Sequence, residues 1–222
     1  MPTESGGHVV QPRADARLPV GGAIKGAVNA AFTVLAFPCV AWYHLWASVA
    51  PSRADVTMQG VSQLLGLVPG VIGGFVRRAF YRRTLRRCGA EVSIGFGTII
   101  ATPDVEIGEG VYIGPFCNIG HASIGDDTLL GSNVTLLGGT RQHGIARLDI
   151  PMRHQPGEYR RISVGRDVWI GNGAIVADDV GEQSVVGAGA VVTKPLAPRW
   201  VAVGNPARVI AERVSCVGAR ET

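Results

Sequence analysis

The chain has 222 residues, of which 46% are hydrophobic and 17% charged, so a disordered protein is excluded and one or two domains with a buried core are expected. Glycine contributes 31 residues without a Gly-X-Y period, which excludes a collagen-like chain. The net charge of +4, with six arginines between residues 77 and 87, favours an acidic surface or ligand over nucleic acid as the partner. Four cysteines without CxxC spacing make no disulfide framework and indicate a reducing compartment.

Residues 1–22 are polar and are predicted to be a mobile arm, followed by a helical segment over 23–88 that associates with a membrane. No Asp, Glu, Lys or Arg lies between Lys25 and Arg53, and the centre, residues 30–50, is long enough to cross a bilayer. Pro38 in its middle and interface-preferring Trp42 and Trp46 argue against a plain span. An interfacial or re-entrant segment, a true span and a soluble helix packed on a neighbour all remain open.

Residues 57–88 predict two helices broken at Pro69-Gly70. The second helix is apolar at first and then rich in arginine, which suits early turns in acyl chains and later turns among anionic headgroups, or else a solvated basic helix. Basic residues favour the cytoplasmic side of a membrane. We therefore expect a cytoplasmic protein at the inner face of the cytoplasmic membrane.

An aliphatic residue followed by glycine recurs about every six residues from residue 91 onward, and 12 of the 19 glycines between 91 and 204 directly follow Ile, Leu or Val. A sustained period of six indicates a repeat array of short strands, because an α-helix has a period of about 3.6. Three six-residue sides make a coil, and glycine and aspartate just after the aliphatic residue supply the backbone angles of tight corners. A second inward position lies two residues earlier and is small or β-branched: Val105, Val111, Cys117, Ala122, Thr128, Val134, Ile162, Val168, Ala174, Ser184 and Ala190.

The chain resembles the hexapeptide-repeat acyltransferases, in particular the branch of sugar and exopolysaccharide O-acetyltransferases, from about residue 64 to 208. The motifs that carry the resemblance are Gln142-His143-Gly144, Asp167-Val168-Trp169-Ile170-Gly171, Val192-Thr193-Lys194-Pro195 and Gly204-Asn205-Pro206-Ala207-Arg208. The resemblance implies a left-handed parallel β-helix over 89–204 and a tail over 205–222. It also implies acetyl-CoA as co-substrate, no permanently bound cofactor, and a homotrimer with its sites between chains.

The array is interrupted once, by a long loop over 139–162, and such an excursion from a rigid repeat is usually functional. Acyl transfer from a thioester to a hydroxyl needs a base, and a histidine has a suitable pKa. His143 matches the family's catalytic loop position and is the predicted base. Arg141 is expected to bind substrate, and His154 either binds substrate or is simply exposed. Like Arg141, the residues Arg153, Gln155, Arg160 and Arg161 are available to an anionic acceptor, but nothing in the sequence orders them.

His121 is predicted to stack beneath Gly138, where the loop departs, because one coil there has 17 residues. It is therefore an alternative base, a substrate-binding residue or a solvated corner residue. Asn118 points outward near it and is either a substrate-binding residue or an ordinary polar surface residue. Trp169 faces outward. By the resemblance it lines the acceptor and catalytic pocket, and the alternative is that it packs against a loop or another chain. The resemblance further assigns Ala188, Lys194 and Arg208 to coenzyme A, while the alternative for each is an ordinary surface residue.

By the resemblance, the expected function is coenzyme-A-dependent O-acetylation of a sugar hydroxyl on a polysaccharide or lipid-linked glycan, with a histidine base and no covalent intermediate. Two other functions remain open at this point. A non-catalytic β-helix scaffold is one, and a zinc enzyme of the γ-carbonic-anhydrase type is the other, although its close His-x4-His pairing is absent. The acceptor is also open among glycans, free sugars, serine and chloramphenicol-like compounds. Cys117 falls on an inward position, so it is predicted to pack rather than to act as a nucleophile.

Overall fold

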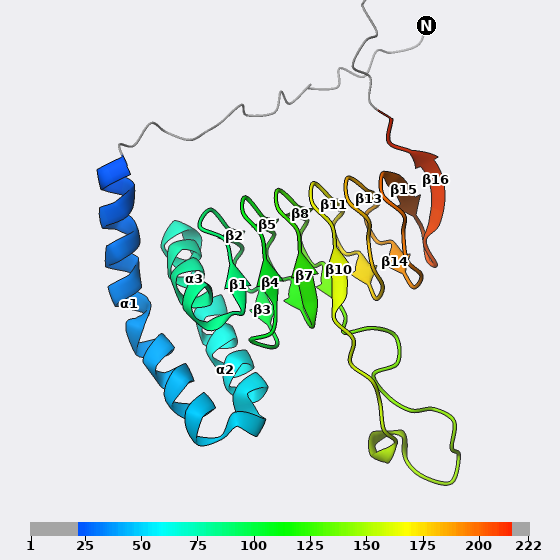
Figure 1. The fold of residues 1–222 in the computed structure, drawn as a ribbon, viewed down its shortest axis with the longest axis horizontal. Coiled ribbons are helices and arrows are strands. Elements are labelled where there is room, and N and C mark those ends of the chain that lie inside the picture. Colours follow the sequence, from blue (N-terminus) through cyan, green and yellow to red (C-terminus); the bar gives the residue numbers. More distant parts are fainter. Residues whose placement is uncertain (1–21, 215–222) are drawn as a thin grey trace, which may run out of the picture.

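Three α-helices precede the repeats in the computed structural model, which describes residues 22–214, so nearly all of the expected arm lies outside it. Helix α1 (Gly22–Val49) continues through Pro38 and leads by a 3-10 turn, η1 (Pro51–Arg53), to α2 (Ala54–Gly66) and α3 (Gly70–Thr84). The predicted break at Pro69-Gly70 is confirmed. Figure 1 shows α1 outermost, with α2 and α3 between it and the first coil.

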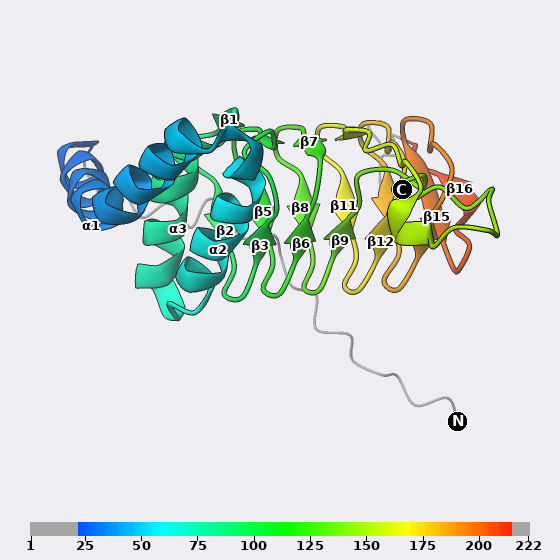
Figure 2. The ribbon, with the colours of Figure 1, turned by 90° about the horizontal axis from the view of Figure 1, so that it is seen from below.

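The repeats form a parallel β-helix whose short strands stack along the axis into three sheets (Figure 2), as predicted. Sheet A contains β1 (Arg87–Cys88), β4 (Glu106–Ile107), β7 (Ala122–Ile124) and β10 (Ile162–Val164). Sheet B contains β2 (Ser93–Ile94), β5 (Tyr112–Ile113), β8 (Leu129–Leu130), β11 (Trp169–Ile170), β13 (Val185–Val186), β15 (Trp200–Val203) and β16 (Arg208–Glu212). Sheet C contains β3 (Ile99–Ile100), β6 (Asn118–Ile119), β9 (Thr135–Leu136), β12 (Ile175–Val176) and β14 (Val191–Val192).

The register between coils follows the spacing of the aliphatic residues. Tyr112 pairs with Leu129, and Trp169 pairs with Val185, so each residue lies beside the one that occupies the same place in the next coil. Thr135 and its partner Ile175 are much further apart in the sequence, because the long loop is inserted between them. The interruption therefore leaves the stacking intact and adds the loop at one corner.

The interior of the prism is filled by the predicted inward residues, every one of which is buried. The polar members are satisfied there: the Thr128 hydroxyl donates to the Gly165 carbonyl at 2.8 Å, and the Ser184 hydroxyl donates to the Ala197 carbonyl at 3.0 Å. Because small and β-branched side chains fill the space, the prism has no room for a ligand along its axis. The chemistry of this protein must therefore lie on the corners, the faces or the loop.

The corners correct one expectation about glycine. The residue with left-handed backbone is the third after the aliphatic one, for example Asp127 at φ 57° and Asn133 at φ 58°. The glycine directly after the aliphatic residue is needed for another reason, since a Cβ on Gly125 would lie 2.5 Å from the Arg166 backbone nitrogen. Close stacking of coils, rather than backbone angle, excludes larger residues at that position.

The β-sheet extends beyond residue 204, where the sequence suggested only a tail. Strand β16 turns back and pairs antiparallel with β15, so that Trp200 lies opposite Glu212. Figure 1 shows this hairpin closing the end of the β-helix opposite the helices. A reversed strand at this end shields the last parallel edge from pairing with another chain.

The arginine cluster is not a single basic surface. Arg77 is 1% exposed, and its guanidinium donates to the carbonyls of Leu65 at 3.0 Å, Val68 at 2.8 Å and Ile94 at 3.0 Å. It therefore ties the C-terminal end of α2 to α3 and to the first coil, where a positive charge also suits the helix dipole. Arg86 and Arg87 form exposed ion pairs with Glu106 and Asp126.

Replacing Arg77 by alanine is expected to lower the free energy of unfolding by about 3 kcal/mol, because three buried carbonyls lose their donor. Arg77→Lys is expected to cost nearly as much, since an ammonium group cannot reproduce the planar fork. Urea denaturation followed by circular dichroism measures both. Arg82→Ala, an exposed position on the same helix, is the control, and equal midpoints for the Arg77 and Arg82 variants would contradict this role.

Candidate active site

The long loop leaves the β-helix after β9 and returns at β10, with a short 3-10 turn, η2 (Met152–His154), near its tip. Its two limbs are joined at the base, where the Glu158 amide donates to the Arg141 carbonyl at 2.8 Å and the Arg160 amide to the Gly138 carbonyl at 2.9 Å. Figure 1 shows the loop projecting well away from the coils. A rigid base with a projecting tip is suited to reach beyond its own chain.

Three polar side chains order this loop, which corrects the expectation that nothing does. Gln155 is buried, and its amide donates to the carbonyls of Arg147 at 2.7 Å and Ile150 at 3.2 Å. The Arg160 guanidinium holds the carboxylates of Asp178 and Asp179, with 2.9 Å to Asp179. Arg161 pairs with Glu106 at 3.1 Å. These side chains are occupied in holding the loop, so they are not free ligands for an acceptor.

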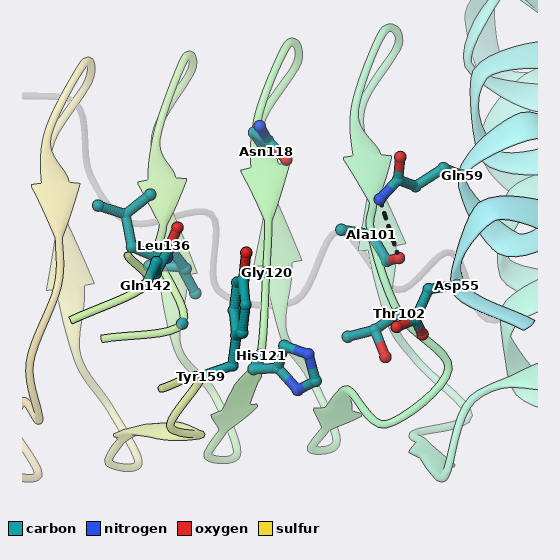
Figure 3. Close-up of a pocket in the computed structure, with 12 residues that line it drawn as sticks. Asp55, Gln59, Ala101, Thr102, Asn118, Gly120, His121, Leu136, Gln142 and Tyr159 are labelled. Carbon is teal, nitrogen blue, oxygen red and sulfur yellow. Dashed lines mark hydrogen bonds between the residues drawn. The ribbon is translucent and has the colours of Figure 1, made fainter. Parts of the chain in front are cut away.

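A cavity of about 340 Å³ lies where the loop meets the β-helix, between α2 and the loop base (Figure 3). Its wall is mostly polar and comes from three parts of the chain: α2, the corner after sheet C, and the loop. The polar side chains that line it are Asp55, Gln59, Thr102, Asn118, His121, Gln142 and Tyr159. One imidazole, one carboxylate and several amides and hydroxyls therefore face a single space.

The predicted stacking of His121 is confirmed, because a Cβ on Gly138 would lie 3.6 Å from the His121 Cβ. The half-buried imidazole lies beside Tyr159, with 6.1 Å between ring centroids. Asn118 lies on β6 and faces outward into the same cavity. Both residues are thus brought together at the point where the loop departs.

His143 and His154 do not line the cavity. His143 follows Gln142, which does, but its own side chain is exposed and has no hydrogen-bond partner within residues 22–214. His154 accepts a hydrogen bond from Arg153 at 3.2 Å near the loop tip. Within one chain, therefore, His121 is the imidazole of the cavity, while His143 is presented outward by the loop.

The remaining predicted residues lie on other faces. Trp169 lies on sheet B and is 56% exposed, which confirms that it faces outward. Because His121 lies at the corner between sheets C and A, the two side chains do not share a pocket. Ala188, Lys194 and Arg208 are all exposed near the last two coils. One chain therefore does not bring Trp169 and His143 into a common site.

Asp55, Gln59 and Tyr159 were missed by sequence reasoning. Asp55 lies far before Asn118 in the sequence, and only the packing of α2 on the first coils joins them. Tyr159 lies within the long loop over 139–162. An aromatic residue in that loop is the one sequence signal that could have identified it. Cys117, by contrast, is buried as predicted, and burial raises the pKa of its thiol, so it is a poor nucleophile.

Over residues 22–214, no group of three His, Cys, Asp or Glu side chains is placed to hold a metal ion.

Two family models match the repeats. The model described as bacterial transferase hexapeptide (six repeats) matches residues 104–138, and the model of the hexapeptide repeat of succinyl-transferase matches residues 161–194. Galactoside O-acetyltransferase of Escherichia coli is 41% identical over 93 residues, which are 40% of this chain and 43% of that protein. Serine acetyltransferase of Mycobacterium tuberculosis is 37% identical over 135 residues, 59% of this chain and 53% of that protein. The matches thus span about half the length of these relatives.

Solved structures with the same fold extend the match. A maltose O-acetyltransferase from Clostridium difficile superposes with a TM-score of 0.63 at 24% identity, covering 72% of this chain and 89% of that one. A hexapeptide-repeat acetyltransferase of Vibrio cholerae in complex with acetyl coenzyme A gives a TM-score of 0.56 at 20% identity, covering 76% and 92%. At these identities the likeness establishes the fold.

Removing the amide of Gln155 tests how the loop is held. Gln155→Ala is expected to speed amide hydrogen exchange between residues 145 and 155 on the order of tenfold, because the buried hydrogen bonds across the loop are lost. Exchange in β11 to β14 is expected to stay unchanged. Met152→Ala, an exposed residue of the same loop, is the matched control, and equal exchange in both variants would show that Gln155 does not order the loop.

Proposed function

We propose that this chain, which belongs to the hexapeptide-repeat transferase family, is an acetyltransferase that moves an acetyl group from acetyl-CoA to a hydroxyl of a sugar. The observation that carries the proposal is the polar cavity at the base of the loop, where an imidazole lies beside side chains suited to bind hydroxyl groups. The names of the relatives, which include acetyltransferases of galactosides, maltose and serine, support the same class of reaction.

The lining of the cavity supports a sugar over serine as the acceptor. A sugar presents several hydroxyls, each of which donates and accepts hydrogen bonds, and none of them is charged. Asp55 accepts such bonds, while Gln59, Asn118 and Tyr159 do both. No lysine or arginine lines the described cavity, so the carboxylate of serine would find no cationic partner there.

The reaction needs a base but no covalent intermediate. In the proposed mechanism His143 takes the proton of the acceptor hydroxyl as the oxygen attacks the thioester carbonyl carbon. The tetrahedral intermediate then collapses, the carbon–sulfur bond breaks, and the imidazolium returns the proton to the leaving thiolate. In the proposed assembly Trp169 of a neighbouring chain forms part of the wall beside the reacting groups, while His121 and Asn118, at the base of the loop that carries His143, position the acceptor.

The donor is proposed to lie along the last coils. Lys194 and Arg208 are exposed cations there and are suited to the phosphates of coenzyme A, and the small side chain of Ala188 leaves room for the pantetheine arm. Coenzyme A acts as a co-substrate and leaves after each turnover.

An assembly is part of the proposal, because the site is split between faces in one chain. The loop exposes Ile145 and Leu148, the latter by 99%, and sheet B exposes Tyr112, Leu129 and Trp169. Exposed apolar side chains of this kind favour burial against another chain. We expect a homotrimer in which the loop of one chain, with His143, closes over the sheet B face of its neighbour.

The acceptor panel is the direct test. Release of free thiol from acetyl-CoA is measured with galactosides, maltose and serine, using the full chain. We expect kcat/KM for sugars to exceed kcat/KM for serine by at least about tenfold. A ratio of this size corresponds to the free energy that one well-placed set of hydrogen bonds contributes. Acetylation of serine without any transfer to sugars would overturn the choice of acceptor, and no thiol release with any of them would favour a scaffold.

Substituting the three histidines separately tests the base. His143→Ala is expected to lower kcat on the order of 10²–10⁴-fold with little change in the KM for acetyl-CoA. His121→Ala is expected to raise the KM for the acceptor more than it lowers kcat. His154→Ala, in the same loop, is the control. The reverse pattern for His121 and His143 would move the base to the cavity of the single chain.

Mixed assemblies distinguish a shared site from a site within one chain. If His143 and Trp169 act from neighbouring chains, co-refolding the His143→Ala and Trp169→Ala variants in equal amounts is expected to restore about a quarter of the sites. Half of the chains then have an intact His143 and half an intact Trp169, so about one interface in four combines the two. If both act within one chain, the mixture stays inactive. Recovery of activity therefore supports a site shared between chains, as the proposed homotrimer requires, independently of the identity of the acceptor.

A further inference from the structure

Helix α1 is apolar on the side that faces away from the rest of the protein. The side chains of this side, called here the outer α1 face, are Val34, Leu35, Phe37, Trp42, Leu45, Trp46 and Val49, all of them exposed. By length and composition, the segment Ile24–Val49 is long and apolar enough to cross a membrane. The rest of the protein buries 11% of its most apolar stretch of 18 residues. A helix that is apolar on all sides is unstable in water unless something covers it.

The opposite side of α1 is firmly packed. Phe32 stacks on Phe75 with 4.9 Å between ring centroids, and Tyr43 meets Phe80 edge-on at 6.2 Å. The His44 imidazole lies 3.1 Å from the Arg83 carbonyl. Because these contacts fix α1 on α3, its outer face is a defined surface of the folded chain, as the outermost position of α1 in Figure 1 also indicates.

These contacts argue against a helix that crosses the bilayer. Arg78 donates to Asn29 at 2.9 Å, and Arg83 donates to Thr33 at 2.8 Å, so two guanidinium groups lie against the first half of α1. A crossing helix would carry them and α3 into the hydrocarbon, which is costly for charged groups. A helix lying in the plane of the interface keeps the arginines at the level of the headgroups instead.

The charge of the helices fits an anionic partner. Of the 21 basic and 17 acidic residues of the chain, seven basic and one acidic lie between residues 22 and 86, so the rest of the chain has 14 basic and 16 acidic residues. Arg77 is buried, but Arg53 and Arg82 are exposed, and neither has an ion-pair partner among the described residues. Each exposed cation near an anionic membrane adds to the electrostatic attraction.

We propose that the outer α1 face docks on an anionic lipid bilayer, with α1 lying in the interface rather than across it. Trp42 and Trp46 are the anchors, because indole prefers the boundary between headgroups and acyl chains. An apolar groove of about 420 Å³ opens beside them against Gly60 and Leu64 of α2. The proposal holds whether or not the chain is an acetyltransferase.

Flotation of the full chain with lipid vesicles tests the docking. Binding is expected to vesicles of phosphatidylcholine with about one third phosphatidylglycerol, and to weaken at high salt. The double variant Trp42→Glu, Trp46→Glu is expected to lose binding at least about tenfold. Arg53→Glu with Arg82→Glu is expected to remove the preference for the anionic vesicles. Ile210→Glu, exposed on β16 at the far end of the β-helix, is the matched control.

A second measurement needs no substitution. Brominated lipids quench nearby indoles, so we expect the wild-type chain to lose the part of its emission that comes from Trp42 and Trp46 and to keep the part that comes from Trp169 and Trp200. Wild-type chain that neither floats nor is quenched overturns the proposal. It is also overturned if light scattering without vesicles shows that the Trp42→Glu, Trp46→Glu variant has a lower mass than the wild type, because the face would then join copies of the chain.

Discussion

The close stacking of one coil on the next is the constraint on which the rest of this structure depends. A Cβ on Gly114 would lie 2.6 Å from the Gly131 carbonyl carbon, and one on Gly171 would lie 2.5 Å from the Ala188 nitrogen. Each coil also donates backbone hydrogen bonds to its neighbour, for example from Gly131 to the Ile170 carbonyl at 2.8 Å. The result is a stiff, filled prism on whose corners side chains have fixed positions.

Because the prism is filled, its recognition surfaces come from what is attached to it. The loop is attached at the corner that follows His121, and α2 is attached through Arg77 and through Ser62, whose hydroxyl lies 2.6 Å from the Tyr81 hydroxyl and accepts from the Ile100 amide at 2.8 Å. Burial raises the pKa of Tyr81 to about 12, so this contact stays uncharged across the physiological range. The cavity exists because both attachments are rigid.

The three faces of the prism differ in chemistry. Sheet A presents polar side chains such as Glu106 and Ser123, whereas sheet B presents Tyr112, Leu129 and Trp169 in register along the axis. An apolar ladder of this kind favours a partner, and a polar one favours water. Together with the outer α1 face, this division gives the chain two apolar surfaces and a polar one, and we propose a neighbouring chain and a membrane as the partners of the apolar ones.

The sequence by itself determined the features that depend on local periodicity. The alternation of side chains in a strand is set by neighbouring residues, so the inward positions followed directly, and the length of one coil placed His121 under Gly138. The break at Pro69-Gly70 followed from backbone chemistry. Only the tertiary structure decided that the buried Arg77 side chain joins α2 and α3 to the first coil, and that Asp55 and Asn118 line the same cavity. Both depend on how α2 packs against coils far along the chain, and contacts at such separations leave no period in the sequence.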